Sequence, residues 1–412
     1  MTNSTTLAPE TSEHRATLLF RLCIGVYFLG GFLNSLVGLL VPRLRMIEGL
    51  THTRALLVQF AFHSSYLLFA LPITALVVKF GYMRSIAAGL VVIALGCGLL
   101  AASLGSFGYM VVLLALLALA SGVTFLQIAA NIVVPVVEPT RRAVSRLTFL
   151  QGFNSLGTVL ASLAGSTLLL GTGRPRTGDL TNHVRVVFPF LAVALVASAL
   201  ASAFIYRRDL LLASSTPRHV PLSGIVGVLL NRRLLAGAGA MFAYVGAEVT
   251  IGTLLVEYLA MPETLGISPV AAGQLVGLYW AGALAGRLVG ARYLARYSAP
   301  TMLLGCAITA IALVGMAIGL QGPVAASALL AVGLCNAIMY PTIFALALPD
   351  DHSTATYASM LLCMVVVGGA IIPLLTGVVA DMVGLKIAFG LPGACYIVIA
   401  GFAWWRHRTW TL

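Results

Sequence analysis

The sequence predicts an all-α integral membrane protein, and two features carry that prediction. Only 9% of the 412 residues are Asp, Glu, Lys or Arg, whereas 60% are hydrophobic and the mean hydropathy is +1.03. Ordinary soluble domains carry about 25% charged residues. The apolar runs are continuous and close to the ~20 residues that a helix needs to cross a bilayer, without the alternation of a membrane β-barrel. The fold class is therefore a bundle of transmembrane helices.

Twelve apolar runs follow one another along the chain, each long enough for one span. In order they are 18–41, 55–78, 85–104, 109–134, 147–170, 186–206, 234–257, 270–291, 301–320, 324–347, 356–379 and 388–405. The first run follows a polar segment and lacks a short apolar core with a small-residue cleavage site. We therefore expect a retained span and not a cleaved signal peptide.

The longest polar stretch between spans divides them into two sets of six. It has the sequence YRRDLLLASSTPRHVPLSG, from Tyr206 to Gly224. Two bundles with a solute site near the midplane between them are the plan of many secondary transporters. We expect a cytoplasmic tail over 1–15, a six-helix bundle over 16–208, a cytoplasmic linker over 209–232, a second six-helix bundle over 233–405 and a cytoplasmic tail over 406–412.

The net charge of +12 indicates membrane topology and not a nucleic-acid partner. If the amino terminus is cytoplasmic, seventeen of the 24 Lys and Arg residues fall in inside loops or at inside span ends, as the positive-inside rule requires. They are spread over many loops and form no patch with interleaved aromatic residues. The sequence predicts a multi-pass, monomeric protein of the cytoplasmic (inner) membrane, with both termini cytoplasmic and the lipid bilayer as its surroundings.

Enzyme chemistry finds no support in the sequence. The six cysteines all lie within spans and show no CxxC spacing, so they predict packing residues and not disulfides or metal ligands. No nucleophile, base and orienting acid stand in a plausible relation, and no Walker-type loop is present. We therefore expect no enzyme activity, no cofactor, no metal and no ATP-driven step.

Small residues recur in the eighth span, where Gly282, Gly286 and Gly290 follow one another every four residues. Such spacing makes a smooth ridge that predicts close packing against another helix. Arg287 lies within this ridge near the cytoplasmic end of the span. We interpret it as a charge at the membrane interface and not as a substrate ligand.

Polar side chains within the spans come in pairs three or four residues apart, which places both members on one face of a helix. Amides and phenols donate and accept hydrogen bonds and suit a neutral polyhydroxylated solute, whereas an anionic substrate would need arginines at midspan. The alternative is that the amides only hold helices together. The pairs are Gln127 and Asn131, Gln151 and Asn154, Tyr244 and Glu248, and Asn336 and Tyr340. With these eight, the candidate substrate-binding residues include Asn34, Gln59 and Trp280.

Glu248 is a carboxylate in the middle of an apolar span and is the candidate for ion coupling. A fixed charge at a helix centre costs ~2.5–3.5 kcal/mol on the most lenient scale. Desolvation disfavours the ionised form, so a proton can bind and leave as the exposure of the site changes. The alternative is a structural acid that stays protonated or hydrogen-bonded. His63, four residues after Gln59, is the secondary candidate, and its alternative is a hydrogen bond to a neighbouring helix.

Several blocks of the sequence resemble the fucose, glucose and galactose permeases of the major facilitator superfamily. In order over nearly the whole chain they are SLVGLLVPRL, LVQFAF, FLQIAANIVV, SRLTFLQGFNSLGT, YVGAEVTIGTLLVEYL, YWAGALAGRLVG and MYPTIFALAL. The resemblance implies the major facilitator fold, with twelve transmembrane helices in two six-helix bundles, and sugar uptake by alternating access. It also implies sugar contacts at or near Gln127, Asn131, Gln151 and Asn154. Glu248 matches the seventh-span acid of the glucose and galactose members.

The resembling family commonly carries an acid in its first span, where this chain has Gly38. Any coupling ion must then be carried by Glu248. We expect secondary active import of a neutral hexose, such as glucose or galactose, or of a related monosaccharide, with a proton as the coupling ion and sodium as the alternative ion. The alternative functions are an uncoupled sugar uniporter, a drug or metabolite exporter on the same fold, and a non-transporting membrane sensor.

Overall fold

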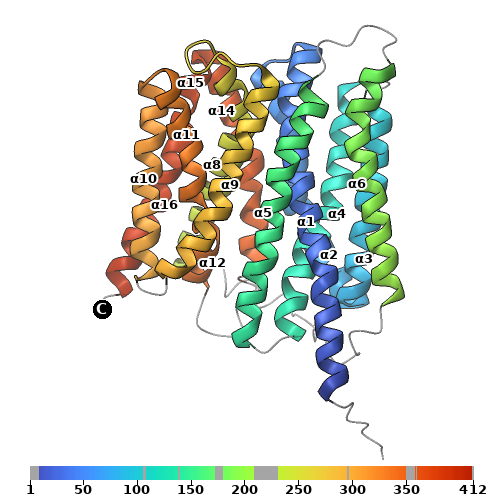
Figure 1. Ribbon diagram of the computed structural model, residues 1–412. Coiled ribbons are helices and arrows are strands. Elements are labelled where there is room, and N and C mark those ends of the chain that lie inside the picture. The colour runs from blue at the N-terminus through green and yellow to red at the C-terminus, as the bar shows by residue number, and fades with distance from the viewer. Residues whose placement is uncertain are drawn as a thin grey trace, which may run out of the picture.

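The computed structural model describes residues 9–104, 108–137, 140–171, 180–207, 231–294, 297–348, 358 and 360–410. In this part of the chain every regular element is a helix (Figure 1). The first set of helices, called the N-bundle, comprises α1 (Pro9–Glu48), α2 (His52–Phe80), α3 (Tyr82–Ser103), α4 (Tyr109–Val137), α5 (Thr140–Leu170) and α6 (Leu180–Tyr206).

The second set, called the C-bundle, begins after the expected linker, most of which lies outside the described residues. It comprises α8 (Arg232–Ala260), α9 (Pro269–Leu294), α10 (Ala299–Gly319), α11 (Gly322–Asn336), α12 (Met339–Ala347), η3 (Val365–Val367), α14 (Gly368–Val383), α15 (Leu385–Ala388) and α16 (Gly390–Trp410).

Eleven described segments are long and apolar enough to cross a membrane. They match eleven of the twelve runs expected from hydropathy. The remaining run, 270–291, is the 26-residue helix α9, which is less apolar because it contains Gln274, Arg287 and a series of glycines. The all-helical fold class is therefore confirmed.

The two ends of the helix bundle are distinguished by the chain termini. We call the end at which α1 begins and α16 ends the terminal face, and the end at which α1 ends and α2 begins the opposite face. Figure 1 shows the first residues of α1 and the last residues of α16 at the same end of the molecule. The span that ends with α14 is interrupted by the 3-10 turn η3, and the span formed by α11 and α12 is interrupted between these two helices.

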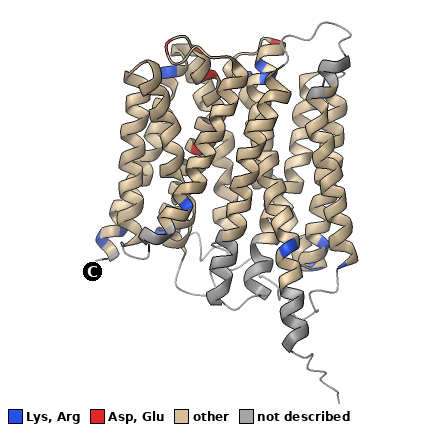
Figure 2. Cartoon of the chain, in the orientation of Figure 1, with Lys and Arg blue, Asp and Glu red and all other residues tan. Residues whose placement is uncertain are grey.

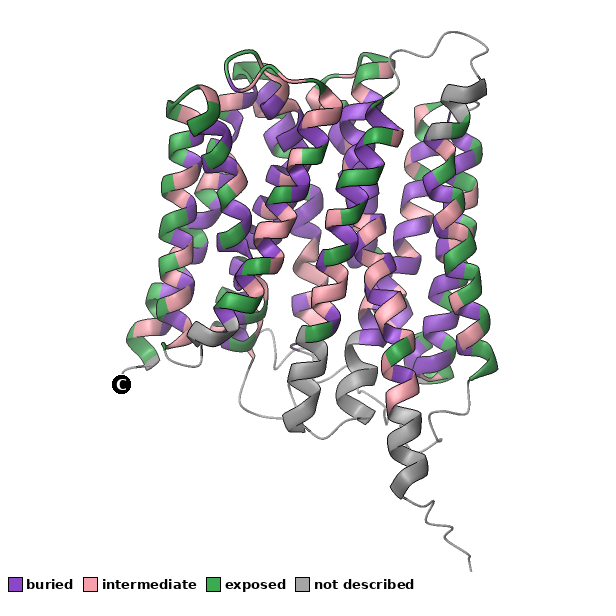
Figure 3. Ribbon diagram, in the orientation of Figure 1, coloured by how far each residue is buried: buried purple, intermediate pink, exposed green. Residues whose placement is uncertain are grey.

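The outside of the bundle is apolar, as a lipid-facing surface requires. Leu195 is 73% exposed and Leu95 is 69% exposed, and buried positions lie mainly where helices face one another (Figure 3). Close helix contacts depend on glycine. A Cβ at Gly286 would lie 2.5 Å from Ala337, and one at Gly290 would lie 2.3 Å from Ile338. The glycine ridge of α9 thus packs against the α11–α12 region.

Candidate functional site

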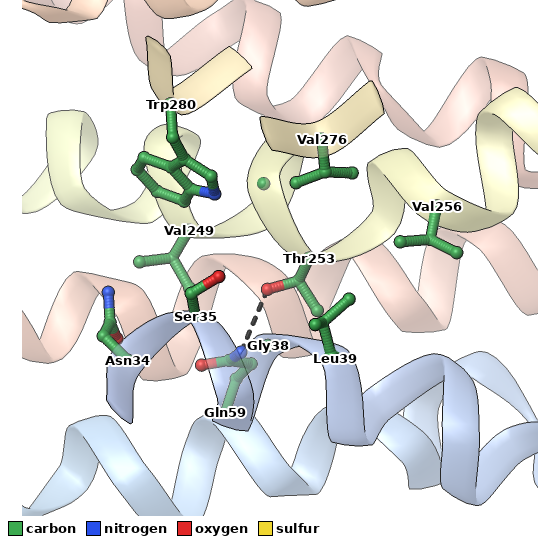
Figure 4. Close-up of a pocket in the computed structure, with 11 residues that line it drawn as sticks. Asn34, Ser35, Gly38, Leu39, Gln59, Val249, Thr253, Val256, Val276 and Trp280 are labelled. Carbon is green, nitrogen blue, oxygen red and sulfur yellow. Dashed lines mark hydrogen bonds between the residues drawn. The ribbon is translucent and has the colours of Figure 1, made fainter. Parts of the chain in front are cut away.

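A small cavity with a mixed polar and apolar lining lies where the two bundles meet, between α1, α2, α8 and α9 (Figure 4). Its volume is about 20 Å³, room for about one or two water molecules. Its polar lining consists of Asn34, Ser35, Gln59, Thr253 and Trp280. The cavity brings together three of the expected binding residues, Asn34, Gln59 and Trp280, and in this conformation it is too small for a monosaccharide.

Gln59 joins the bundles at this cavity. Its Nε2 donates to Oγ1 of Thr253 at 3.0 Å, while its Oε1 is buried without a hydrogen-bond partner. An unsatisfied buried acceptor costs ~1–3 kcal/mol, so a hydroxyl group placed in the cavity would be stabilised here. Asn34 and Trp280 line the same cavity (Figure 4), and neither side chain has a hydrogen-bond partner among the described residues.

Two glycines shape the cavity. A Cβ at Gly38 would lie 3.9 Å from Nε2 of Gln59, which is an ordinary contact. Position 38, where the resembling family commonly has an acid, therefore faces the Gln59 amide with room to spare. A Cβ at Gly252 would lie 2.9 Å from the Trp280 ring. Glycine at position 252 thus allows the indole to lie against α8.

Glu248 belongs to a hydrogen-bond network within the C-bundle. The Tyr244 hydroxyl donates to Oε1 of Glu248 at 2.7 Å, one helical turn away, and also faces the Asn336 carbonyl at 3.3 Å. Nδ2 of Asn336 donates to the Tyr279 hydroxyl at 2.8 Å, and the Tyr396 hydroxyl donates to Oδ1 of Asn336 at 2.8 Å. Side chains from α8, α9, α11 and α16 are thereby linked to one another around the carboxylate.

The network and the cavity are neighbours along α8. Gly252, which lines the cavity, follows Glu248 by four residues, or ~6 Å along a helix. The other described carboxylate side chains all lie at the opposite face: Glu48, Glu257, Glu263 and Asp381. Figure 2 shows acidic positions gathered at that end of the molecule. Among the side chains that the structure describes, Glu248 is the acid at mid-span.

Two members of the network, Tyr279 and Tyr396, stand outside the polar pairs predicted from the sequence. Each is a lone phenol on its own helix, and neither has a polar partner at helical spacing that would have marked it. Of the expected pair Asn336 and Tyr340, only Asn336 joins the network. Tyr340 instead packs against the Tyr244 ring, with ring centroids 6.2 Å apart.

The expected amides of the N-bundle serve different contacts. Nδ2 of Asn154 donates to the Tyr27 carbonyl at 3.1 Å and so joins α5 to α1. Gln127 lies within hydrogen-bonding reach of Tyr66. Gln151 is half-buried and meets α9 through its backbone carbonyl. The side chain of Asn131 lies outside the described residues.

Arg287 crosses from one bundle to the other. Its Nη1 donates to the Gln151 carbonyl at 3.1 Å and to Oγ of Ser155, both on α5. It also lies within electrostatic range of Glu248 and Tyr244. The interpretation as a membrane-interface charge is therefore incomplete, because the guanidinium reaches sideways between helices. The sequence shows only a lone arginine among glycines, which does not reveal that direction.

His63 is buried against the other bundle. Its Nδ1 lies 3.2 Å from the Gln59 carbonyl of its own helix, and a Cβ at Gly369 would lie 2.6 Å from its ring. The hydrogen bond thus lies within α2, whereas the alternative considered for His63 from the sequence was a bond to a neighbouring helix. The ring fills space between α2 and α14.

Two helical bundles that meet around buried polar groups inside a membrane have the architecture of a secondary transporter. The comparisons with known proteins agree with that class. The chain belongs to the Major Facilitator Superfamily, whose sequence profile matches residues 23–355. It is thus a multi-pass membrane transporter and not an enzyme.

The chain is similar over most of its length to several characterised proteins. It is 37% identical to the glucose/galactose transporter of Brucella abortus biovar 1 (strain 9-941), over 91% of this chain and 90% of that protein. It is 29% identical to the L-fucose-proton symporter of Escherichia coli (strain K12), over 98% of this chain and 96% of that protein. The solved structure of the transporter FucP in the outward conformation matches with a TM-score of 0.74 and 26% identity, over 95% of this chain and 99% of that one.

Proposed function

We propose that this transporter imports a neutral monosaccharide of the glucose and galactose kind by alternating access, with Glu248 as the coupling group for protons. The single observation that carries the proposal is the set of neutral donors and acceptors between the bundles, next to one mid-span carboxylate. Amides and an indole suit hydroxyl groups and a C–H sugar face. The names of the relatives support the substrate class, and one of them is a proton symporter.

The direction of transport depends on the orientation in the membrane. Described basic residues near the terminal face include Arg21, Lys79, Arg84, Arg207, Arg232, Arg233, Arg406 and Arg408. Described acidic side chains other than Glu248 lie at the opposite face. The positive-inside rule then supports a cytoplasmic terminal face and an inner-membrane location, with the opposite face toward the outside.

The coupling role of Glu248 follows from its surroundings. Its partner Tyr244 can donate to the ionised form, while the apolar neighbourhood of the span disfavours a charge. Movement of the bundles changes the exposure of such a site, which lets a proton bind on one side and leave on the other. The proton is favoured over sodium because the described residues around Glu248 contribute phenols and an amide but no second carboxylate.

The test is sugar uptake into proteoliposomes, with and without an inward proton gradient, for the native chain and Glu248→Gln. We expect the gradient to drive accumulation only in the native chain, while exchange of labelled for unlabelled sugar persists in the variant. Glu263→Gln removes an acid from a loop at the opposite face and is the matched control, with native accumulation expected. If the native chain accumulates no sugar in response to the gradient, the coupling proposal fails.

An uncoupled uniporter is the second candidate, and Gly38 is the observation that favours it. The position faces Gln59 with no acid, although a side chain would fit. A uniporter would exchange and equilibrate sugar in the same vesicles without accumulation, and Glu248→Gln would leave the equilibration rate unchanged. A sensor would show neither exchange nor equilibration of sugar. An exporter would accumulate amphipathic compounds, and not hexose, inside inverted vesicles.

A further inference from the structure

Several exposed aromatic rings at the terminal face each lie against a basic side chain. The pairs formed by described residues are Lys79 with Phe80, Arg207 with Tyr206, Arg406 with Trp405 and Arg408 with Trp404. At the opposite face, by contrast, Arg45 pairs with the carboxylate of Glu257. Aromatic rings at the ends of transmembrane helices lie at the level of the lipid headgroups. The basic side chains of the terminal face are therefore placed where lipid headgroups can meet them.

Arg408 of α16 makes the closest of these contacts. Its guanidinium carbon lies 3.9 Å from the centroid of the Trp404 ring, one helical turn earlier. The other pairs have separations of 5.3–6.0 Å. A guanidinium that lies on an aromatic face keeps its planar fork of N–H groups available to an oxyanion, and this fork fits phosphate. The tryptophan thus orients an exposed cation for a phosphate group.

An apolar stripe on the same side of α16 leads from Arg408 toward the membrane interior. Ile397, Gly401, Trp404 and Arg408 are exposed and follow one another at intervals of three or four residues, so they lie on one face of the helix. A Cβ at Gly401 would meet nothing within 4 Å, which leaves the middle of the stripe low. We call these four residues the α16 stripe.

The length of the α16 stripe matches one leaflet of a bilayer. Ile397 precedes Arg408 by eleven residues, or ~16 Å along a helix. One leaflet fills about half of the ~30 Å hydrocarbon core. The stripe therefore has room for an acyl chain along its apolar part, with a cation at the headgroup end.

The end of α16 is held against α10 next to Arg408. Nδ1 of His407 lies 3.2 Å from Oγ1 of Thr301, in the first turn of α10, and that oxygen lies 2.6 Å from the Ser298 hydroxyl. The Ser298 side chain makes no capping bond to the α10 backbone. Polar groups of α10 thus fix the turn of α16 that carries the cation.

The charge of this region favours an anionic lipid. In Figure 2 the coloured positions at the terminal face are basic, and the described acidic side chains other than Glu248 lie at the opposite face. The positive-inside rule supports a cytoplasmic terminal face, and the cytoplasmic leaflet carries anionic phospholipids that attract basic residues. A zwitterionic lipid would instead bring its own cation close to Arg408.

We propose that the α16 stripe binds an anionic phospholipid of the cytoplasmic leaflet, with the phosphate on Arg408 and an acyl chain along Trp404, Gly401 and Ile397. A soluble anion would use only the cation, whereas a phospholipid uses the cation and the apolar stripe together. The site shares no residue with the cavity or with the network around Glu248, so the proposal stands apart from sugar transport and its coupling.

Fluorescence quenching by brominated lipids measures which lipid lies on the stripe. The full chain with Trp280, Trp405 and Trp410 replaced by phenylalanine keeps Trp404 as its reporter. It is reconstituted in mixed bilayers of phosphatidylglycerol and phosphatidylcholine, in which one or the other lipid carries bromine on its acyl chains. We expect phosphatidylglycerol to be enriched roughly fivefold over phosphatidylcholine beside Trp404, which is ~1 kcal/mol.

Three variants of this reporter chain separate a phosphate contact from general attraction to charge. Arg408→Gln should abolish the preference, so that both lipids quench in proportion to their abundance. Arg408→Lys keeps the charge and loses the planar fork, and it should lose most of the preference. Arg84→Gln is the matched control, because it removes an exposed arginine of the same face from the start of α3, and it should keep the preference.

Equal quenching by the two lipids in the reporter chain, or a preference that survives Arg408→Gln, would overturn the proposal. A lysine variant as selective as its parent would overturn the phosphate contact, because only charge would then matter. Glycerol 3-phosphate in the aqueous phase distinguishes a lipid from a free phosphate. It should leave the preference unchanged, and loss of the preference would assign the site to a soluble anion.

A second measurement uses the native chain and needs no tryptophan replacement. Phosphatidylglycerol added to the detergent-solubilised protein should raise the melting temperature more than phosphatidylcholine does. In Arg408→Gln the two lipids should have equal effects, and in Arg84→Gln the difference should remain. Equal effects in the native chain, or a difference that persists in Arg408→Gln, would contradict the proposed site even if the reporter chain failed to fold.

Discussion

Asn336 satisfies three tyrosine hydroxyls and so fixes the surroundings of Glu248. Its amide donates to Tyr279 and accepts from Tyr396, and its backbone carbonyl faces Tyr244. The residue is 1% exposed, so water does not substitute for any of these partners. Because a fully satisfied buried network rigidifies its members, the loss of one hydroxyl should be felt at the carboxylate and at the neighbouring cavity.

Tyr396→Phe removes a single oxygen atom and tests whether the tyrosine network affects the carboxylate and the cavity. It leaves Oδ1 of Asn336 without its donor, and we expect a loss of ~1–2 kcal/mol in stability together with a roughly fivefold higher KM for sugar, or ~1 kcal/mol. The matched control is Tyr258→Phe, which removes the hydrogen bond from the Tyr258 hydroxyl to the Ala317 carbonyl at 2.6 Å. It should cost similar stability and leave KM unchanged.

Thermal unfolding in detergent and uptake kinetics measure the two effects for both tyrosine variants. A KM that rises equally in both would mean that the network does not act on the substrate site. A KM unchanged in both would have the same meaning.

The sequence predicted contacts within one helix better than contacts between helices. Tyr244 and Glu248 are four residues apart on one helix, and their hydrogen bond follows from that spacing. The contacts of Asn336 with Tyr279 and Tyr396 depend on which helices are neighbours and how each is rotated. In a chain whose spans are apolar on every side, hydropathy specifies neither which helices are neighbours nor how each is rotated. The contacts of Asn336 with Tyr279 and Tyr396 could therefore not be predicted from the sequence pattern.

At the scale of elements, the break between α11 and α12 prepares the site. α11 ends at Asn336 and α12 begins at Met339, two residues before Pro341. Proline has no N–H to give to the carbonyl four residues before it, here that of Ala337. The interruption places Asn336 at a helix end, where its carbonyl is available to the Tyr244 hydroxyl.

Pro341→Ala should therefore stabilise the helix and slow transport. The restored N–H closes the helical ladder, which relieves up to ~3 kcal/mol of proline cost, and the Asn336 carbonyl turns to the Tyr340 N–H instead of Tyr244. Pro323→Ala is the control, since Pro323 lies in the first turn of α11, where proline is tolerated. A melting temperature and an uptake rate decide the outcome, and unchanged transport in Pro341→Ala would separate the break from function.

The helices themselves were predicted well and their ends less so. The described residues of each expected run lie in helical segments, some of them interrupted, because backbone groups in lipid must be satisfied within the segment. α1 nevertheless runs from Pro9 to Glu48, well beyond the expected 18–41. Helical hydrogen bonds continue into polar residues once they leave the hydrocarbon, where hydropathy no longer indicates them. The position of the interruption, at 337–338, was also not predicted, although Pro341 was visible within its span.

At the scale of the whole molecule, contacts between the bundles extend inward from the opposite face. Asp381 of α14 accepts hydrogen bonds from the start of α2, and further in Gly377 meets Thr53, Gln59 meets Thr253, and Gly369 meets His63. The cavity and Glu248 thus lie behind a closed opposite face. A rocking motion that admits solute from that side must separate all of these contacts together, so their combined strength sets the cost of opening.

Gly377→Val tests whether the contact between α2 and α14 is the seam that closes this face. The added side chain would meet the Thr53 backbone and Leu56 at 2.8–3.1 Å, and overpacking of this kind costs ~1–3 kcal/mol. Because separation of the bundles relieves the clash, the open state should gain population, and exchange of sugar should slow. Gly305→Val on α10, where a Cβ meets nothing within 4 Å, should leave both unchanged. Spin labels on cysteines that replace Met46 and Met382, which are exposed near the ends of α1 and α14, report the distance between the bundles at this face. A distance distribution in Gly377→Val equal to that of Gly305→Val would place the closing contact elsewhere.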